Sequence, residues 1–432
     1  MKTFATIWSG QVVSQVGSSM TGFALSIFVY QISGSVTQLA LVLLAASVPA
    51  VILAPVAGVW VDRIDRRLIM MGSDGVAGLG AVALLLVAWR SELTFWPMLI
   101  VAAFASASGA FQEPAYRASI VTLVPKEKLG RTNGMIEMGP ALGTLLAPAL
   151  AGVILLIFGI EAILAIDIIT FLVAIIMLAV VRFPQLASMA DARQEKMRSQ
   201  ITDGFNYLRR RGGLLGLLAI AAVLNFFLVF ANVLWLPIFL GFGNEAQVGY
   251  AMTSVGVAMV AGSVVMSAWG GPRHLVRTLL GLIAATGLML SVSGIRPSFW
   301  VAGGAMFAMM FMVPIANGIS QTLWQKKVEA GIQGRVFSTR RMIASIASPI
   351  AFLLAGPLAD GVFEPLLVDG GGLAGSVGHI IGVGVGRGSA FLIILAGFGV
   401  TLTAAAAWLI PAIRNIEADI PDALVPAVLP AD

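Results

Sequence analysis

Long apolar runs, broken by short charged or Gly- and Pro-containing segments, dominate the chain from end to end. From Thr3 to Val61 there is no Asp, Glu, Lys, Arg or His. A membrane-spanning helix needs about 20 mainly apolar residues, so this stretch suffices for two. Backbone groups in lipid must bond internally, and the runs are too long for barrel strands, so the pattern predicts helices. Twelve are predicted, at residues 4–30, 37–61, 68–88, 94–118, 132–157, 161–182, 213–240, 246–270, 275–295, 298–324, 336–359 and 388–411.

The positive charges indicate how these spans are oriented. An even number of spans places both termini on one side of the membrane. Only Arg90, Arg296 and Arg387 then fall on the opposite side, which leaves 23 of the 26 Lys and Arg on the side of the termini. Lys and Arg are enriched in cytoplasmic loops, so we expect both termini in the cytoplasm and the chain in the bacterial cytoplasmic (inner) membrane. The same asymmetry accounts for the net charge of +5.

Composition excludes several classes of protein. The chain is 59% hydrophobic and 11% charged, whereas soluble domains carry about 25% charged residues. A soluble enzyme, a nucleic-acid binder and a disordered protein are therefore excluded. With no cysteine and two histidines, a disulfide framework or a metal centre is not expected, and we expect no cofactor. The sequence shows no Walker-type phosphate loop and no Ser-His-Asp arrangement, so we expect neither ATP-driven transport nor an enzyme.

Two related halves are indicated by the long central loop and by an internal repeat. Residues 183–212 carry mixed charge, with an expected interfacial helix at 194–211 that meets anionic lipid or simply anchors the topology. The segments 114–135 and 318–339 align at an offset of 204 residues, and each has Gly-Arg at the start of a new helix. We predict an all-α membrane protein, with six-helix bundles at 1–182 and 213–411 related by a parallel pseudo-repeat, joined by the linker 183–212 and followed by a cytoplasmic tail at 412–432. Transporters built in this way bind substrate between the halves.

The sharpest motif is the charged turn between the second and third spans, which reads GVWVDRIDRR from Gly58 to Arg67. It resembles the Gly-x-x-x-Asp-Arg-x-x-Arg-Arg loop of the major facilitator superfamily, and this resemblance implies the twelve-helix fold of that family. It also implies a conformational latch formed by Gly58, Asp62, Arg63, Arg66 and Arg67, in which Asp62 accepts hydrogen bonds and the arginines hold a carboxylate on a neighbouring helix. The alternative is that the arginines only anchor the topology.

A second motif, Gly139-Pro140-Ala141-Leu142-Gly143, is similar to the Gly-Pro motif on the fifth helix of exporters in this superfamily. Gly139, Pro140 and Gly143 would bend the helix and allow close packing, and the resemblance implies export rather than uptake. Ordinary small-residue packing is the alternative. Further segments resemble the drug-exporter branch that includes macrolide efflux proteins and the enterobactin exporter; they lie at residues 8–18, 111–115, 203–208, 334–338 and 381–388.

Ionisable groups inside predicted spans are costly and are candidates for coupling transport to an ion gradient. A desolvated carboxylate there can carry a proton during antiport. The alternative for each is a structural ion pair near the interface. The candidates are Asp74, Glu113, Arg117, Glu137, Asp167, Arg340 and Arg341.

Uncharged polar residues mark the expected substrate cavity. Gln11, Gln15 and Ser18 have the spacing of one helix face. A mixture of amides and aromatics suits a large, mostly apolar solute held by a few directional hydrogen bonds, although hydrogen bonds between packed helices are the alternative for each. The full set is Gln11, Gln15, Ser18, Gln112, Asn225, Asn232, Trp235, Asn317 and Gln321.

The sequence therefore predicts a secondary active exporter of a hydrophobic or amphipathic small molecule, such as a macrolide-like drug, a siderophore or a peptide natural product. We expect proton antiport, or coupling to another ion, by alternating access. The expected partners are this substrate, the coupling ion and the lipid bilayer, and we expect a monomer that binds no nucleic acid. The alternatives are a lysophospholipid transporter and a non-transporting membrane sensor.

Overall fold

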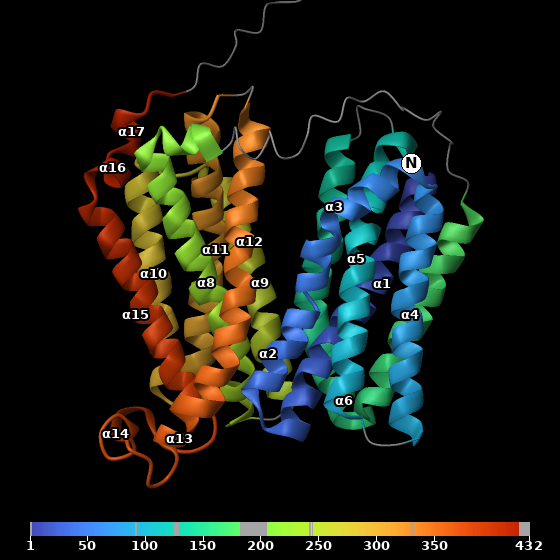
Figure 1. Ribbon diagram of the computed structural model, residues 1–432, viewed down its shortest axis with the longest axis horizontal. Helices are drawn as coiled ribbons and strands as arrows, with labels where there is room; N and C mark the ends of the chain where they lie inside the picture. The colour runs from blue at the N-terminus through green and yellow to red at the C-terminus, as the bar shows by residue number, and fades with distance from the viewer. Residues whose placement is uncertain are drawn as a thin grey trace, which may run out of the picture. The chain divides into compact units, whose positions relative to one another are not determined.

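The computed structural model describes residues 2–90, 93–124, 129–181, 205–241, 243, 245–329 and 332–422. All regular structure in these ranges is helical, which confirms the predicted all-α class. Eleven of the described helices are long and apolar enough to cross a membrane, and Figure 1 shows them as the long, roughly vertical ribbons.

The helices that form these apolar stretches are α1 (Lys2–Ser33), α2 (Val36–Ala45), α3 (Val48–Arg63), α4 (Arg66–Arg90), α5 (Phe95–Leu123), α6 (Leu129–Val180), α8 (Gly212–Leu240), α9 (Glu245–Trp269), α10 (Leu275–Ile295), α11 (Phe299–Lys327), α12 (Gln333–Leu358) and α15 (Arg387–Leu409). The ten-residue α2 and the start of α3 share one stretch. The shorter elements are the π-helical turn η3 (Ala359–Phe363), α13 (Glu364–Leu367), α14 (Gly378–Ile381), α16 (Pro411–Arg414) and α17 (Ile416–Asp419).

The chain divides into two compact units. Unit 1 comprises Met1–Asp191, Trp235–Gly256 and Ala355–Val362. Unit 2 comprises Ala192–Leu234, Val257–Leu354 and Phe363–Asp432. Unit 1 thus includes short segments from late in the sequence, at the end of α8, the first half of α9 and the end of α12.

Most predicted spans coincide with one helix, but the span expected at 37–61 is divided in two. Helix α2 ends at Ala45 and α3 begins at Val48, with Ser47 outside the helical region at φ −123° and ψ −45°. Pro49 lies in the first turn of α3. Proline has no backbone N–H and clashes with the preceding turn of a continuous helix, so it starts a new helix here.

The helix α6 joins two predicted spans, 132–157 and 161–182, into one element of 52 residues. At 1.5 Å per residue this is about 78 Å, far more than the roughly 30 Å hydrocarbon layer. Gly159 interrupts the helical geometry with φ 78° and ψ −177°. Only glycine adopts this backbone region readily, so the chain direction changes at this one residue.

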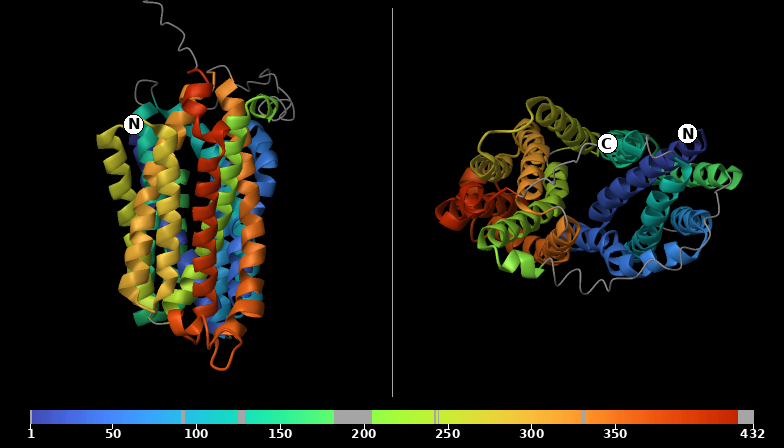
Figure 2. Two further views of the ribbon diagram at one scale, coloured as in Figure 1. Left: turned by 90° about the vertical axis from the view of Figure 1, so that its left-hand side faces the viewer. Right: turned by 90° about the horizontal axis from the view of Figure 1, so that it is seen from above.

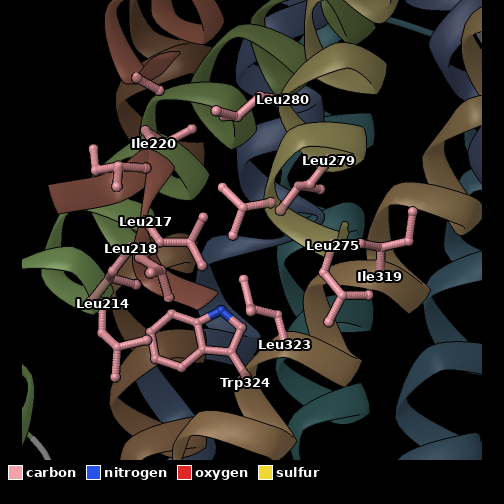
Figure 3. Packing of buried hydrophobic residues seen from close by; sticks show 14 of the residues in the cluster. Leu214, Leu217, Leu218, Ile220, Leu275, Leu279, Leu280, Ile319, Leu323 and Trp324 are labelled. Carbon is pink, nitrogen blue, oxygen red and sulfur yellow. The ribbon is translucent and has the colours of Figure 1, made fainter. Parts of the chain in front are cut away.

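The core of unit 2 lies where the start of α8, the start of α10 and the end of α11 meet, as Figure 3 shows. Trp324 is 1% exposed among leucines and isoleucines of all three helices. Glycines bring α10 and α15 close together, and the two helices run side by side in Figure 2. A Cβ on Gly287 would lie 2.7 Å from the carbonyl oxygen of Gly397, so the backbones are in contact, as is common in membrane helix pairs.

Two segments outside the long helices are held by acidic side chains. In the glycine-rich loop at 361–386, the Glu364 carboxylate accepts hydrogen bonds from the backbone N–H groups of Gly386 and Gly388, where α15 begins. In the predicted tail at 412–432, Glu417 accepts from the N–H groups of Leu275 and Val276, both at 3.0 Å. Most of the predicted interfacial helix at 194–211 lies outside the described residues, and residues 205–209 are helical.

Candidate transport site

A hydrogen-bonded cluster inside unit 1 joins three helices around the Asp74 carboxylate. Asp74 lies on α4 and is 5% exposed. Gln11 on α1 donates from Nε2 to Asp74 Oδ2 at 3.0 Å, and Gln112 on α5 donates from Nε2 to Asp74 Oδ1 at 3.0 Å. Gln112 Nε2 also donates to Gln11 Oε1 at 2.8 Å. The structure thus brings together two residues predicted to line a cavity and one predicted to couple transport to an ion.

Among the residues that the structure describes, no cationic side chain forms an ion pair with Asp74. A carboxylate buried without a counter-charge is costly, and neutral amide donors offset only part of that cost. The cluster also contains a spare acceptor, because Gln112 Oε1 is buried without a hydrogen-bond partner. Rotation of an amide exchanges its donor and acceptor ends, so this side chain can accept a hydrogen bond from a protonated carboxyl as well as donate to a carboxylate.

A second buried acid, on α6, contacts α1 two helical turns beyond Gln11. Asp167, in the second part of α6, is 3% exposed and accepts a hydrogen bond from Ser18 Oγ at 3.3 Å. Gly17 allows this contact, since a Cβ there would lie 2.3 Å from Thr170 Oγ1 and 3.1 Å from Asp167 Oδ1. Gln11 and Ser18, separated by two helical turns, therefore each carry a buried carboxylate partner on another helix.

The Gly-Pro motif on α6 forms a tight contact with α1. A Cβ on Gly139 would lie 3.3 Å from Gln15 Oε1, and one on Gly143 would lie 2.6 Å from Ser19 Oγ. Further along α6, a Cβ on Gly249 of α9 would lie 2.5 Å from the carbonyl oxygen of Pro148. Small residues thus let α6 pack closely against two other helices of unit 1.

In the predicted latch, Arg67 has backbone rather than carboxylate partners among the described residues. Its Nε donates to the carbonyl oxygen of Leu178 at 2.8 Å and its Nη2 to that of Ala179, so it caps the last turn of α6. Asp65 caps the start of α4 by accepting from the Arg67 N–H at 2.9 Å. Arg66 is half-buried and has partners of its own. Gly58, Asp62 and Arg63 belong to α3, but the surroundings of Gly58 and the side chains of Asp62 and Arg63 lie outside the described part of the structure.

The remaining coupling candidates are distributed over three helices. Glu113 and Arg117 form an exposed ion pair on α5 at 2.9 Å, one of the arrangements that the sequence suggested. In unit 2, Arg340 donates to Ser320 Oγ at 3.0 Å and to Gln321 Oε1 at 3.3 Å, and its guanidinium lies 5.3 Å from the centre of the Trp324 ring. The side chains of Glu137 and Arg341 lie outside the described part.

The other residues predicted to line the cavity do not form one cluster. Gln15, Asn232 and Asn317 are exposed, and Asn225 is half-buried with a partner. Trp235 is 2% exposed and stacks on Phe239 with ring centres 5.8 Å apart, so it belongs to the packed interior of unit 1.

Sequence reasoning missed Asp360 and Lys327, which bind backbone groups far away in the sequence. Asp360 accepts from Ser35, Val36 and Thr37 at the start of α2. Lys327, at the end of α11, is 5% exposed and donates to the carbonyl oxygens of Glu417 and Ile420. The sequence signal was weak: Ser35 is a favoured residue before a helix, but nothing local indicates a carboxylate partner more than 300 residues away.

Long apolar helices that enclose bonded polar groups, with a buried carboxylate among amides, are the features of a multi-spanning membrane protein. The profile of the Major Facilitator Superfamily matches residues 7–352. Macrolide efflux protein A of Streptococcus pyogenes is 30% identical over 361 residues, which cover 83% of this chain and 89% of that protein. The multidrug efflux pump Tap of Mycobacterium tuberculosis is 24% identical over 372 residues, covering 83% of this chain and 86% of the pump.

The chain belongs to the major facilitator superfamily, in its drug-exporter branch. The fold agrees, since the chain superposes on an inward-facing bacterial homologue of the human lysosomal transporter Spinster with a TM-score of 0.70 at 12% identity, over 99% of this chain and 98% of that one. These comparisons confirm the family resemblance read from the motifs, and with it the expectation of a membrane transporter rather than an enzyme.

Proposed function

We propose that this protein exports a hydrophobic or amphipathic small molecule across the bacterial cytoplasmic membrane by proton antiport. The similarity to proteins named for macrolide and multidrug efflux supports this direction and this substrate class. A macrolide antibiotic is therefore the first probe, ahead of siderophores and peptide natural products.

The observation that carries the coupling proposal is the buried Asp74 carboxylate held by the Gln11 and Gln112 amides at 3.0 Å. Proton antiport needs a group that alternates between a charged and a neutral form. Asp74 has amide donors that stabilise its charged form and lacks an ion-pair partner among the described residues, so that neither form is locked in place. By contrast, the exposed Glu113–Arg117 pair has the geometry of a surface ion pair.

We further propose twelve membrane spans, because Gly159 divides α6 into two lengths that each suit one crossing. Six spans on each side of residues 183–212 would then form two bundles related by the parallel repeat, working as a monomer with both termini in the cytoplasm. Alternating access would expose the Asp74 cluster to one side of the membrane at a time. The loop from Gly58 to Arg67 would latch one state through Asp62.

The test measures uptake of a radiolabelled macrolide into everted membrane vesicles that contain the Asp74→Asn variant. An imposed pH gradient drives the uptake. We expect Asp74→Asn to abolish gradient-driven accumulation, so that the internal-to-external ratio of the probe falls to about one. Substrate exchange in the absence of a gradient should persist, because it needs binding and conformational change but no proton transfer. This second measurement separates a loss of coupling from a loss of folding.

Glu113→Gln is the matched comparison, since it neutralises a carboxyl in the same unit that is exposed and already paired. We expect this variant to accumulate the probe normally. Loss of accumulation in Glu113→Gln but not in Asp74→Asn would overturn the assignment of Asp74. Accumulation that follows an imposed Na⁺ gradient instead of the pH gradient would overturn proton coupling while leaving export intact.

A further inference from the structure

The backbone N–H groups at the start of α2 donate hydrogen bonds to a side chain that lies more than 300 residues later in the sequence. The first N–H groups of a helix have no partner inside it. Here the N–H groups of Val36 and Thr37 donate to the two oxygens of Asp360 at 2.9 and 2.8 Å. Ser35 accepts hydrogen bonds from the next two N–H groups of the helix. Its side-chain oxygen accepts from the Gln38 N–H and its carbonyl oxygen from the Leu39 N–H, both at 3.2 Å.

Ser35 also links the two sides of this contact, since its hydroxyl donates to Asp360 Oδ2 at 2.7 Å. The Asp360 carboxylate therefore accepts three hydrogen bonds from one helix start. Among the described residues it forms no ion pair. Its counter-charge is the positive end of the α2 dipole, which favours an anion at this position. All of these residues belong to unit 1.

The backbone around Asp360 is shaped for the contact. Asp360 lies in the π-helical turn η3. Such turns are wider than those of an α-helix; they are rare overall, and those that occur are frequently found at functional sites. One turn earlier, a Cβ on Gly356 would lie 2.4 Å from the Cα of Thr37. The glycine thus lets the end of α12 come into direct backbone contact with the start of α2.

We propose that Asp360 is a positioning residue for transport. Its hydrogen bonds hold the start of α2 against the end of α12 in the conformation in which the protein is closed on that side of the membrane. This inference rests on the proposed alternating access and the proposed orientation, which place both segments on the outer side. Opening that end requires segments 323 to 325 residues apart in the chain to separate. Water can then solvate both the carboxylate and the freed N–H groups, so the contact is reversible.

The test measures the separation directly, which the absence of cysteine makes possible. Spin labels on the double variant Gln38→Cys/Val362→Cys report the distance between the two segments by pulsed electron resonance. We expect a short-distance population that Asp360→Asn reduces in favour of a longer one, raising the ratio of open to closed by about tenfold. The separate variant Asp360→Glu keeps the negative charge, and it should retain much of the closed population.

Asp369→Asn is the matched control, because it removes the same charge from an exposed position in the following loop, and it should leave the distances unchanged. A purely structural cap would lower the thermal unfolding midpoint of Asp360→Asn without changing the ratio of the two populations, and that result would overturn the proposal. The measurement uses neither substrate nor pH gradient. Failure of the Asp74 assignment and failure of this one are therefore distinguishable.

Gly356→Ala provides a second route should Asp360→Asn fold poorly. Alanine normally favours a helix over glycine, but here its Cβ would collide with Thr37. We expect the open population to rise, whereas Gly304→Ala on α11, where a Cβ meets nothing within 4 Å, should have no effect. A closed population that survives Gly356→Ala would overturn the close-contact part of the proposal.

Discussion

At the scale of single residues, small side chains decide where helices come close enough for polar groups to bond. On α1, a Cβ on Gly10 would lie 2.8 Å from Met177 Sδ, and one on Gly17 would collide with Thr170. The two glycines are two turns apart and face the same part of α6. The hydrogen bond from Ser18 to Asp167 depends on this approach, so packing and the placement of a buried acid are linked.

Gly17→Ala tests this link. The added methyl group would lie 2.3 Å from Thr170 Oγ1, and overpacking of this kind costs about 1–3 kcal/mol. We expect a lower thermal unfolding midpoint in detergent and reduced transport. Gly22→Ala, on the same helix with nothing within 4 Å of the new Cβ, should be neutral or slightly stabilising. Equal effects of the two substitutions would contradict the packing argument.

At the scale of elements, several helix ends are satisfied by charged side chains from distant segments. Glu364 binds the start of α15, Glu417 the start of α10, and Arg67 the end of α6. In each case the charge of the side chain is opposite in sign to the partial charge at that helix end, so the interaction is favourable. These contacts tie loops and the carboxyl-terminal segment to the helices, and the carboxyl-terminal segment is held in addition by Ile413 and Ile416, which are buried in the core of unit 2.

Such contacts also mark where sequence reasoning stopped. The bounds of α10 agree with the predicted 275–295 because charged and turn residues flank the apolar run. The break between α2 and α3 could have been predicted from Pro49. The partners of Glu417 and Asp360 could not, because a backbone N–H carries no sequence signal and periodicity describes only local structure. For the same reason the sequence nominated Asp74, Gln11 and Gln112 separately, and only the structure joins them.

The carboxyl-terminal segment should loosen in acid. A hydrogen bond from the buried Lys327 ammonium lowers the pKa of Asp422, which pairs with it at 2.8 Å. A lowered folded-state pKa means that the pair stabilises the docked segment fully above the unfolded value of about 3.9, and that this stabilisation is lost as the pH falls through the lower folded value. Asp422 is largely exposed, so the effect is small.

A spin label at Ala418→Cys should become slightly more mobile as the pH falls below about 4. Asp422→Asn should remove most of this pH dependence, because the label should then show the same slight increase in mobility at neutral pH. Asp419→Asn, a neighbouring acid in the same segment, should leave the wild-type profile unchanged. An identical pH profile in the Asp422→Asn variant would show that another group controls the docking.

At the scale of the whole molecule, the chain has the family's helical fold, and the proposed orientation follows from the distribution of Lys and Arg. That distribution is a statistical signal along the sequence. The structure adds two exposed reporter positions: Asp369 in the glycine-rich loop and Lys326 at the end of α11. The proposed topology places them on opposite sides of the membrane.

Single-cysteine labelling measures this orientation. A membrane-impermeant maleimide should label Asp369→Cys in intact cells, and should label Lys326→Cys only after the membrane is permeabilised. The chain has no native cysteine, so the unmodified protein is the background control. The reverse pattern would invert the topology and place the Asp360 contact on the cytoplasmic side.

The Asp360 contact has an evolutionary consequence. Two of its three donors are backbone N–H groups, which nearly every residue supplies. Substitutions at Val36 or Thr37 would therefore leave those bonds in place, except for proline, which has no N–H. Substitutions can therefore change the strength of this contact almost only at position 360, and to a smaller extent at Ser35, which is the one side-chain donor. Suppressors of an Asp360 defect should consequently arise elsewhere in the protein, and not by a compensating exchange on α2.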